Sequence, residues 1–215
     1  MSAIAERRSE EKERRRGEIV DAAEALYAAR GWDAVTMDQV AKSARLSRAL
    51  VYVYFRDKDE LLFAIGERAM EVLRERFVGA VGRHDRGLEQ VEAIGRAYMA
   101  YAHEFPHYFD VCARFQGHSV SPDPGSNEGA CAAAGDAAIG VVVQAIETGV
   151  GDGSIRSDVG NPMLFAVALW AFTHGTIQLA MAKGTELSRL GIRAAEFGNY
   201  SLGLLKYLAV VPPGR

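Results

Sequence analysis

The sequence has very few cysteines and no segment in which polar and apolar residues alternate as they do in β-strands. Among the 215 residues the only cysteines are Cys112 and Cys131, which do not form a CxxC pair. A disulfide framework or a structural zinc site therefore has no support, and we expect the protein in a reducing cytoplasm. The apolar residues recur instead at helical spacing, which predicts an all-α protein of about nine helices.

The chain also lacks an overall excess of positive charge. Its net charge is −3, and residues 61–215 hold 13 basic and 16 acidic residues, so the bulk of the protein should not attract DNA. Residues 1–16 are rich in Arg and Glu and lack an apolar core, so we expect no secretory signal there. This start is typical of a solvated arm leading into the first helix, either as a frayed terminus or as an additional groove contact.

Helix-start signals are dense over residues 36–62. Thr36 and Gln39 have the spacing of a capping box, which predicts a short helix over residues 37–44. Ser47 is the next N-cap candidate, so a second helix begins about three residues after the first one ends. Two helices joined by so short a turn must cross steeply, and a helix-turn-helix of this kind is a unit that reads DNA.

A local basic patch coincides with this unit. Residues 42–58 contain five basic residues and one acidic residue, in a chain whose total charge is negative. Asp57 and Glu60 repeat the capping-box spacing and begin a third helix. The positive charge is therefore concentrated on the helix-turn-helix.

The middle helix has two different faces. Val51 and Phe55 lie four residues apart and can join Leu46 in a core, which leaves a second face of polar, aromatic and apolar residues. That second face holds Arg48, Leu50, Tyr52 and Tyr54. An arginine can bind guanine O6 and N7 in the major groove, a leucine can contact a thymine methyl, and hydroxyl groups suit phosphate oxygens.

Residues 17 to about 65 resemble the amino-terminal domain of the TetR family of bacterial transcriptional regulators. The resemblance includes a long first helix closed by Gly31 and followed by Trp32, and the ending LVYVYFRDKDELL. The resemblance implies a set of DNA-facing positions: Thr36, Ser47, Arg48, Ala49, Leu50, Tyr52, Tyr54 and Lys58.

Two positions depart from the family pattern. The turn usually reads Ala-Gly-Val-Ser, whereas this chain has arginine at position 45 in place of the glycine. If this position needs a positive φ, Arg45 costs about 1 kcal/mol more than glycine would. The second departure is Val53, where a tyrosine is common, and it removes one polar contact. Neither departure identifies an operator.

The domain organisation follows from these signals and from the resemblance. We expect a charged arm over residues 1–14, a DNA-binding domain over 15–74 with its motif at 36–55, and a ligand-binding and dimerisation domain over 75–215. The predicted helices after the motif continue to about 79 and then cover 87–103, 106–117, 128–149, 162–183 and 186–208.

Residues 159–182 contain no Asp, Glu, Lys or Arg, a run of 24 that is long enough to span a bilayer. Internal polar residues and the lack of basic flanks beyond Lys183 argue against a membrane span. We predict a helix buried all round, packed on its own body and on a second copy. The resemblance implies a four-helix dimer interface, for which we select Ala166, Trp170, Phe197, Tyr200, Leu204, Leu205 and Leu208. A two-fold dimer predicts a nearly palindromic operator.

Six of the 19 aromatic residues fall within 18 residues, 98–115. They are either ordinary core or the wall of a mostly apolar pocket. TetR-like regulators bind inducers in this region, so the resemblance implies a small-molecule site. The candidate pocket residues are Tyr98, Tyr101, Phe105, Tyr108, Phe109, Cys112, Phe115, Trp170, Thr173, His174 and Ile177.

These features predict a homodimeric DNA-binding regulator, a repressor that a small, mostly apolar ligand releases from its operator. The alternatives are an activator or a regulator that responds to a protein partner, and more remotely a helical small-molecule-binding protein or an enzyme. We expect no cofactor and no metal, because Pro106 interrupts the helix that would align His103 with His107. No catalytic residue is assigned, since His174 near Thr173 or Cys112 is the only candidate and its spacing favours no reaction.

Overall fold

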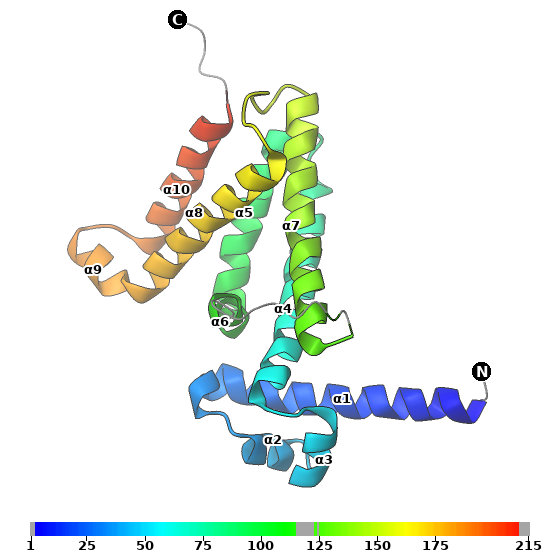
Figure 1. Ribbon diagram of the computed structural model, residues 1–215. Coiled ribbons are helices and arrows are strands. Elements are labelled where there is room, and N and C mark those ends of the chain that lie inside the picture. Colours follow the sequence, from blue (N-terminus) through cyan, green and yellow to red (C-terminus); the bar gives the residue numbers. More distant parts are fainter. Residues whose placement is uncertain (1–2, 115–122, 124, 211–215) are drawn as a thin grey trace, which may run out of the picture. The chain divides into compact units, whose positions relative to one another are not determined.

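The computed structural model describes residues 3–114, 123 and 125–210, and the described residues form only helices (Figure 1). The all-α prediction is confirmed. The helices are α1 (Ala3–Arg30), the short 3₁₀-helix η1 (Trp32–Ala34), α2 (Met37–Ser43), α3 (Arg48–Tyr54), α4 (Lys58–Val81), α5 (Gly87–Glu104), α6 (Pro106–Arg114), α7 (Asn127–Gly151), α8 (Pro162–Ala182), α9 (Gly184–Arg189) and α10 (Ala194–Ala209).

The chain divides into two compact units. The first comprises Met1–Ala69 and Pro106–Ala133, and the second comprises Met70–Phe105 and Ala134–Arg215. The sequence suggested a DNA-binding segment followed by a sensing segment, whereas the structure places α6 with the amino-terminal helices. The reason is physical: the Tyr27 hydroxyl of α1 donates to Asp110 of α6 at 2.7 Å, and the two helices pack together.

Helix α1 supplies the first wall of the first unit. One of its faces buries Ile19, Val20, Ala23 and Tyr27. The helix ends at Arg30 and is followed by Gly31, which has φ of 75° and whose N–H donates to the Tyr27 carbonyl at 2.8 Å. Only glycine adopts this backbone conformation without steric cost, so the predicted C-terminal glycine is confirmed.

The predicted caps of the helix-turn-helix are confirmed. Thr36 and Gln39 form a capping box: the Thr36 N–H donates to the Gln39 side chain at 2.9 Å, and the Gln39 N–H donates to the Thr36 hydroxyl at 3.3 Å. The Ser47 hydroxyl accepts the Leu50 N–H at 3.2 Å and caps α3. These bonds satisfy donors that have no partner inside a helix, so short local signals fix where α2 and α3 begin.

The predicted box at α4 forms only in part. The Asp57 carboxylate accepts the Glu60 N–H at 2.9 Å, as expected. The Glu60 carboxylate, however, accepts the N–H of Arg56 at 2.6 Å and does not return to Asp57.

The turn between α2 and α3 requires a left-handed residue. Arg45 has φ of 57° and is the one non-glycine residue with positive φ in the described part of the chain. Its N–H donates to the Lys42 carbonyl at 3.2 Å, and the Leu46 N–H donates to the Ala41 carbonyl at 2.9 Å. This pair of bonds is a Schellman motif, in which glycine is the preferred residue.

In the second unit, α8 packs on α5 and α10. The connector after α7 caps α5 from a distance, because the Gly87 and Leu88 N–H groups donate to the side chains of Asp152 at 2.8 Å and Ser154 at 3.0 Å. A Cβ on Gly87 would lie 2.0 Å from the Gly149 nitrogen, so the two backbones approach too closely for any other residue. The start of α5 is thereby fixed against the end of α7.

The single helix predicted over 186–208 is wrong: the segment forms α9 and α10. Gly191 has φ of 76°, and the Ile192 N–H donates to the Leu187 carbonyl at 2.9 Å. This is a second Schellman motif, and it ends α9 before α10 begins. This break gives ten α-helices among the described residues, compared with the nine predicted.

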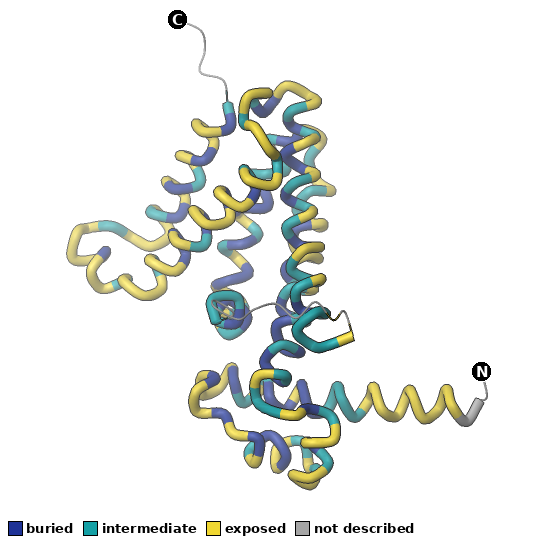
Figure 2. The backbone as a smooth tube through the Cα atoms, viewed as in Figure 1, coloured by how far each residue is buried: buried dark blue, intermediate teal, exposed yellow. Residues whose placement is uncertain are grey.

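In the single chain, helix α8 is buried on one side only (Figure 2). Burial of its other side by a second copy stays a prediction. Ala166, Leu169 and Ile177 are buried, whereas Leu164 is 71% exposed and Met181 is 53% exposed. By length and composition alone, α7 and α8 could each cross a membrane. The core helices of soluble proteins meet the same criterion, and the buried side of α8 packs on α5 and α10.

Candidate nucleic-acid interface

One face of helix α3 packs in the core of the first unit, and the opposite face is exposed to solvent. Val51 and Phe55 are fully buried, as predicted. Tyr52 is 41% exposed and Val53 is 77% exposed on the other side of the helix. The predicted outward face is less open than expected, because Leu50 and Tyr54 are half-buried. The exposed part of α3 therefore centres on its first turn and on Tyr52.

Arg48 is held by groups from two helices. Its Nε lies 3.0 Å from Oδ1 of Asp38, and its Nη1 lies 3.3 Å from Oδ2 of the same carboxylate. Its Nη2 lies 3.5 Å from the Tyr52 hydroxyl, and the guanidinium carbon is 5.5 Å from the Tyr52 ring centroid. Tyr52 and Asp38 together raise the pKa of Arg48 above its ordinary value. Asp38 thus engages two of the guanidinium nitrogens of the side chain that is predicted to contact a base.

The Lys58 side chain makes its contacts with Trp32 of η1. Its Nζ donates to the Trp32 carbonyl at 2.6 Å and lies 4.8 Å from the Trp32 ring centroid. Burial is the largest cause lowering the pKa of Lys58. The ammonium group therefore joins η1 to the start of α4 in addition to any contact it makes with DNA.

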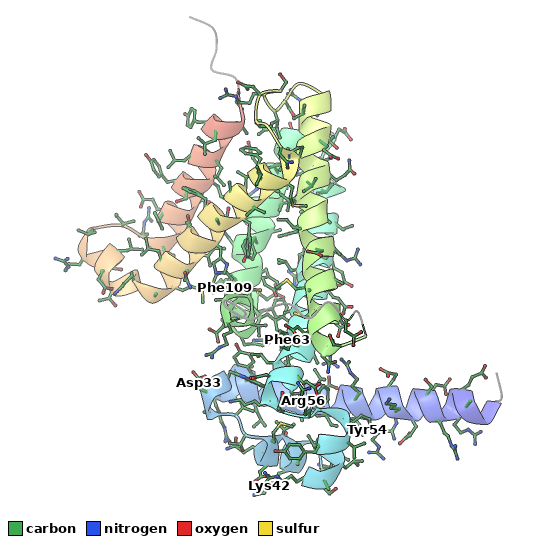
Figure 3. All side chains as sticks on the ribbon, in the orientation of Figure 1. Asp33, Lys42, Tyr54, Arg56, Phe63 and Phe109 are labelled. Atoms are coloured by element: carbon green, nitrogen blue, oxygen red, sulfur yellow. The ribbon has the colours of Figure 1, made fainter. Side chains whose placement is uncertain are left out.

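The remaining cations of the patch differ in how they are paired. Arg56 forms an ion pair with Asp57 at 2.9 Å and lies on the surface of the first unit (Figure 3). Lys42 and Arg45 are exposed and pair with no carboxylate among the residues that the structure describes. All residues of the predicted DNA-facing set lie in the first unit, on α3, at the caps before α2 and α3, or at the start of α4: Thr36, Ser47, Arg48, Ala49, Leu50, Tyr52, Tyr54 and Lys58.

The predicted pocket residues fall into two groups. In the second unit, the Tyr98 hydroxyl lies 2.8 Å from Nδ1 of His174, and the indole N–H of Trp170 donates to that hydroxyl at 3.4 Å. Burial lowers the pKa of His174. The second-unit group comprises Tyr98, Tyr101, Phe105, Trp170, Thr173, His174 and Ile177. Phe77 packs edge-on against Tyr98 at 6.1 Å, a neighbour that sequence reasoning missed.

The other predicted pocket residues belong to the first unit. The Tyr108 hydroxyl donates to Glu24 of α1 at 2.6 Å, and the Cys112 thiol donates to the Tyr108 carbonyl at 3.2 Å. Phe109 is buried. Phe115 lies outside the described residues. A run of aromatics that is continuous in sequence is therefore distributed over both units.

A polar network that the sequence did not reveal joins α6 to α1 and η1 within the first unit. Asp110 accepts from the Tyr27 hydroxyl and from Nε of Arg114, both at 2.7 Å. Arg114 also pairs with Asp33 at 2.9 Å. Burial and the Asp110 carboxylate raise the pKa of Tyr27. The only local signal was the spacing of Asp110 and Arg114, which are four residues apart on one helix.

A cavity of about 410 Å³ lies at the start of α10, lined by Arg193, Ala195, Glu196 and Asn199. None of the predicted pocket residues lines this cavity. The described residues also contain no group of three or more His, Cys, Asp or Glu side chains that could hold a metal.

The predicted dimer residues differ in exposure. Trp170, Tyr200, Leu204 and Leu208 are exposed by 46%, 66%, 39% and 58%, whereas Ala166 and Leu205 are buried and Phe197 is half-buried. Exposed apolar side chains that the prediction omitted extend the same helices: Met163, Leu164, Val167 and Tyr207. Helices α8 and α10 therefore carry a broad apolar surface in the single chain.

A capped helix-turn-helix in one helical unit, accompanied by a second helical unit, is the architecture of a helix-turn-helix regulator. The sequence model described as "Bacterial regulatory proteins, tetR family" matches residues 19–65. The model described as "Tetracyclin repressor-like, C-terminal domain" matches residues 91–197. The chain belongs to the tetR family of bacterial regulatory proteins.

Individual relatives agree with this assignment. The HTH-type transcriptional regulator HbdR from Aromatoleum sp. (strain CIB) is 33% identical over 90 residues, which is 41% of this chain and 38% of that protein. The chain thus matches less than half the length of this curated relative.

Two solved structures share the fold. A protein of unknown function from Rhodococcus sp. RHA1 superposes with a TM-score of 0.75 at 21% identity, covering 92% of this chain and 96% of that one. AibR, in complex with isovaleryl coenzyme A and operator DNA, gives a TM-score of 0.65 at 16% identity, covering 93% and 100%.

Proposed function

We propose that this protein is a transcriptional regulator that inserts α3 into the major groove of an operator. One observation carries the proposal: α3 is capped by Ser47 and anchored by Val51 and Phe55, so that its first turn and Tyr52 face solvent beside a basic patch. A short helix held in this way is suited to enter the major groove with its amino-terminal residues against base edges. The related fold of AibR, which was solved with operator DNA, supports the same use.

The residues of this surface have different proposed roles. Arg48 binds a guanine and Leu50 contacts a thymine methyl, with Ala49 beside them on the recognition helix. Hydroxyl and ammonium groups bind phosphates, namely those of Thr36, Ser47, Tyr52, Tyr54 and Lys58. Base contact requires Arg48 to turn part of its guanidinium away from Asp38, since Nε and Nη1 are both engaged in the free protein.

The second unit is proposed to dimerise and to bind the ligand. The exposed apolar faces of α8 and α10 fit a second copy of the chain, which would place two α3 helices on the half-sites of a nearly palindromic operator. A small, mostly apolar ligand would bind near Tyr98 and His174 and release the repressor from DNA. With these roles, the chain consists of an arm over 1–14, a DNA-binding domain over 15–74 and a sensing and dimerisation domain over 75–215. We propose that the protein is soluble and cytoplasmic.

The test is fluorescence anisotropy of the purified protein on the duplex upstream of its own coding region and on a scrambled duplex, across a salt series. Arg48→Ala is compared with Arg83→Ala, which removes the same charge from an exposed turn of the second unit. Loss of one bidentate base contact should weaken operator binding roughly 5- to 150-fold and leave scrambled binding much less affected. Arg83→Ala should match the wild type.

Tyr52→Phe separates the two proposed kinds of contact. Loss of a phosphate contact should weaken binding to both duplexes by a similar factor. If Arg48→Ala also loses affinity equally on both duplexes, Arg48 does not read a base. If the wild-type protein prefers neither its upstream DNA nor any duplex selected from random sequence, the proposed function is refuted.

A further inference from the structure

The first turns of α1 extend beyond the rest of the first unit as a solvent-exposed helix. Residues 5–14 are all exposed, and from residue 5 onward the first buried residue is Ile19 (Figure 2). At about 1.5 Å per residue, the stretch from Ala3 to Arg16 is roughly 20 Å long. An unpacked helix of this length is marginal in water, so other interactions must favour it.

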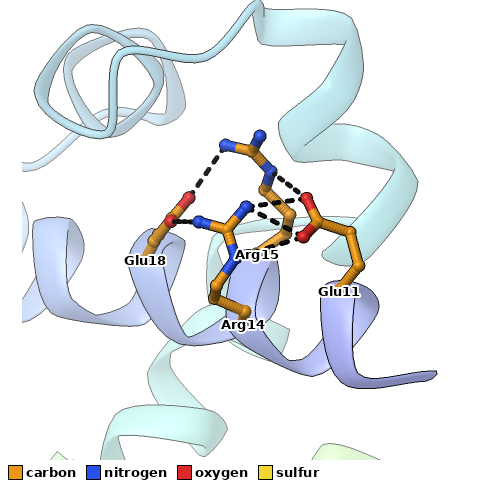
Figure 4. A network of polar contacts seen from close by, with 4 residues as sticks. All are labelled: Glu11, Arg14, Arg15 and Glu18. Carbon is orange, nitrogen blue, oxygen red and sulfur yellow. Dashed lines mark hydrogen bonds and ion pairs between the residues drawn. The ribbon is translucent and has the colours of Figure 1, made fainter. Parts of the chain in front are cut away.

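Ion pairs along the helix supply part of that stability (Figure 4). Arg15 lies 3.0 Å from Glu11 and 3.0 Å from Glu18, and Arg14 lies 2.8 Å from Glu11 and also pairs with Glu18. Pairs at these spacings stabilise an isolated helix. The four residues neutralise one another, so they leave the charge of the helix to its other side chains.

The other charges fall mostly on two sides of the helix. Arg8, Lys12 and Arg16 follow one another at four-residue spacing on one side, and Glu6, Glu10 and Glu13 lie on the other side. Arg7 is a basic residue outside the line of Arg8, Lys12 and Arg16. Ile19 and Ala23, which are buried, continue the line of the basic residues. The basic side of the extension is therefore the continuation of the face by which α1 packs onto the first unit.

Arg16 connects this face to the recognition helix. Its guanidinium carbon lies 5.6 Å from the ring centroid of Phe55, the residue that ends α3. Arg16 is also paired with Glu67 at 3.4 Å and with Asn127 at 2.6 Å, so it serves the structure of the unit. Arg8 and Lys12 are exposed and pair with no described residue.

We propose that Arg8 and Lys12 bind the phosphates of double-stranded DNA outside the segment read by α3. The proposal rests on the proposed function of α3. Phosphates suit this face because it presents one exposed guanidinium and one exposed ammonium group. Both lie on the side of α1 that leads to Arg16, which contacts Phe55. Such groups can follow a phosphate backbone without base-specific geometry. Arg8 and Lys12 are about 6 Å apart along the helix axis. This distance is close to two successive steps of about 3.4 Å between the phosphates of one DNA strand.

The test compares two duplexes: the operator with ten-base-pair flanks on both sides, and the operator trimmed to its core. The variant Arg8→Ala/Lys12→Ala keeps strong helix formers at both positions, and circular dichroism checks that helix content is retained. The matched control, Arg83→Ala/Arg189→Ala, removes the same charge from exposed positions in the second unit.

On the flanked duplex the Arg8→Ala/Lys12→Ala variant should lose roughly tenfold or more in affinity at 0.15 M salt. The slope of log K against log salt should fall by about 3.6, because each of the two subunits loses two phosphate contacts. On the trimmed duplex it should match the wild type, and the control should match the wild type on both. An equal affinity of variant and wild type on the flanked duplex overturns the inference, and so does an equal loss on both duplexes. If the wild type prefers its operator in either case, the proposed function stands independently.

Discussion

Replacing Arg45 with glycine should stabilise the protein, because this residue has φ of 57° at the turn between α2 and α3. In the folded state, an L-residue in the left-handed region is destabilising by roughly 1–2 kcal/mol, and glycine avoids this cost. Glycine also makes the unfolded chain more flexible, which lowers the gain in stability by about 0.5–1 kcal/mol. Arg45 is exposed and makes no ion pair with any described residue, so the substitution removes no side-chain contact. The Schellman bonds to Ala41 and Lys42 use backbone atoms and are retained.

The expected gain is therefore about 0.5–1 kcal/mol in the free energy of unfolding, or roughly 1–4 °C in Tm for a chain of this length. Urea and thermal unfolding followed by circular dichroism measure it. Arg83→Gly is the control, because Arg83 follows α4 in an exposed turn with negative φ, where glycine only adds unfolded-state entropy. The reasoning fails if Arg45→Gly is no more stable than the wild type, or if both glycine variants shift Tm alike.

Two further predictions concern titratable groups that are half-buried or buried. Burial lowers the pKa of His174, so the folded protein holds a proton on this ring less readily than the unfolded chain, in which histidine has its ordinary pKa of about 6.5. Stability should therefore fall as the pH drops below that value. Urea titrations should find that this pH dependence of the free energy of unfolding is absent in His174→Gln and present in the exposed control His103→Gln. Burial raises the pKa of Cys112 and Cys131 to about 12, which predicts slow labelling by a disulfide reagent at pH 8 and fast labelling in urea. Stability should also fall from about pH 9 to 12, since the unfolded chain alone releases these protons; rapid labelling of the folded protein would contradict this account.

The parts of the fold that the sequence predicted are those set by local interactions. The capping box at Thr36, the cap at Ser47 and the C-terminal glycine at position 31 each join atoms within four residues. The anchoring of α3 by Val51 and Phe55 follows equally from helical spacing. Such features need no knowledge of the tertiary structure. The predicted DNA-facing residues lie close to these caps in the sequence.

The parts that could not be predicted depend on partners far apart in sequence. The Tyr27 hydroxyl meets Asp110 across 83 residues, and Gly87 is capped by Asp152 across 65. No spacing rule connects these residues. The density of aromatics over 98–115 was likewise a property of the sequence, and the break between α5 and α6 divides it between the two units.

The pairing of Arg48 with Asp38 bears on how the proposed recognition discriminates between DNA sequences. An exposed ion pair contributes little stability, so a guanine can displace part of it at small cost. DNA without a guanine at that position offers Arg48 no bidentate replacement, and it brings its phosphates toward the Asp38 carboxylate. The carboxylate therefore disfavours every sequence, while the arginine compensates only on the matching one. Discrimination by α3 would then come from both residues, the attractive contact of Arg48 and the repulsion by Asp38.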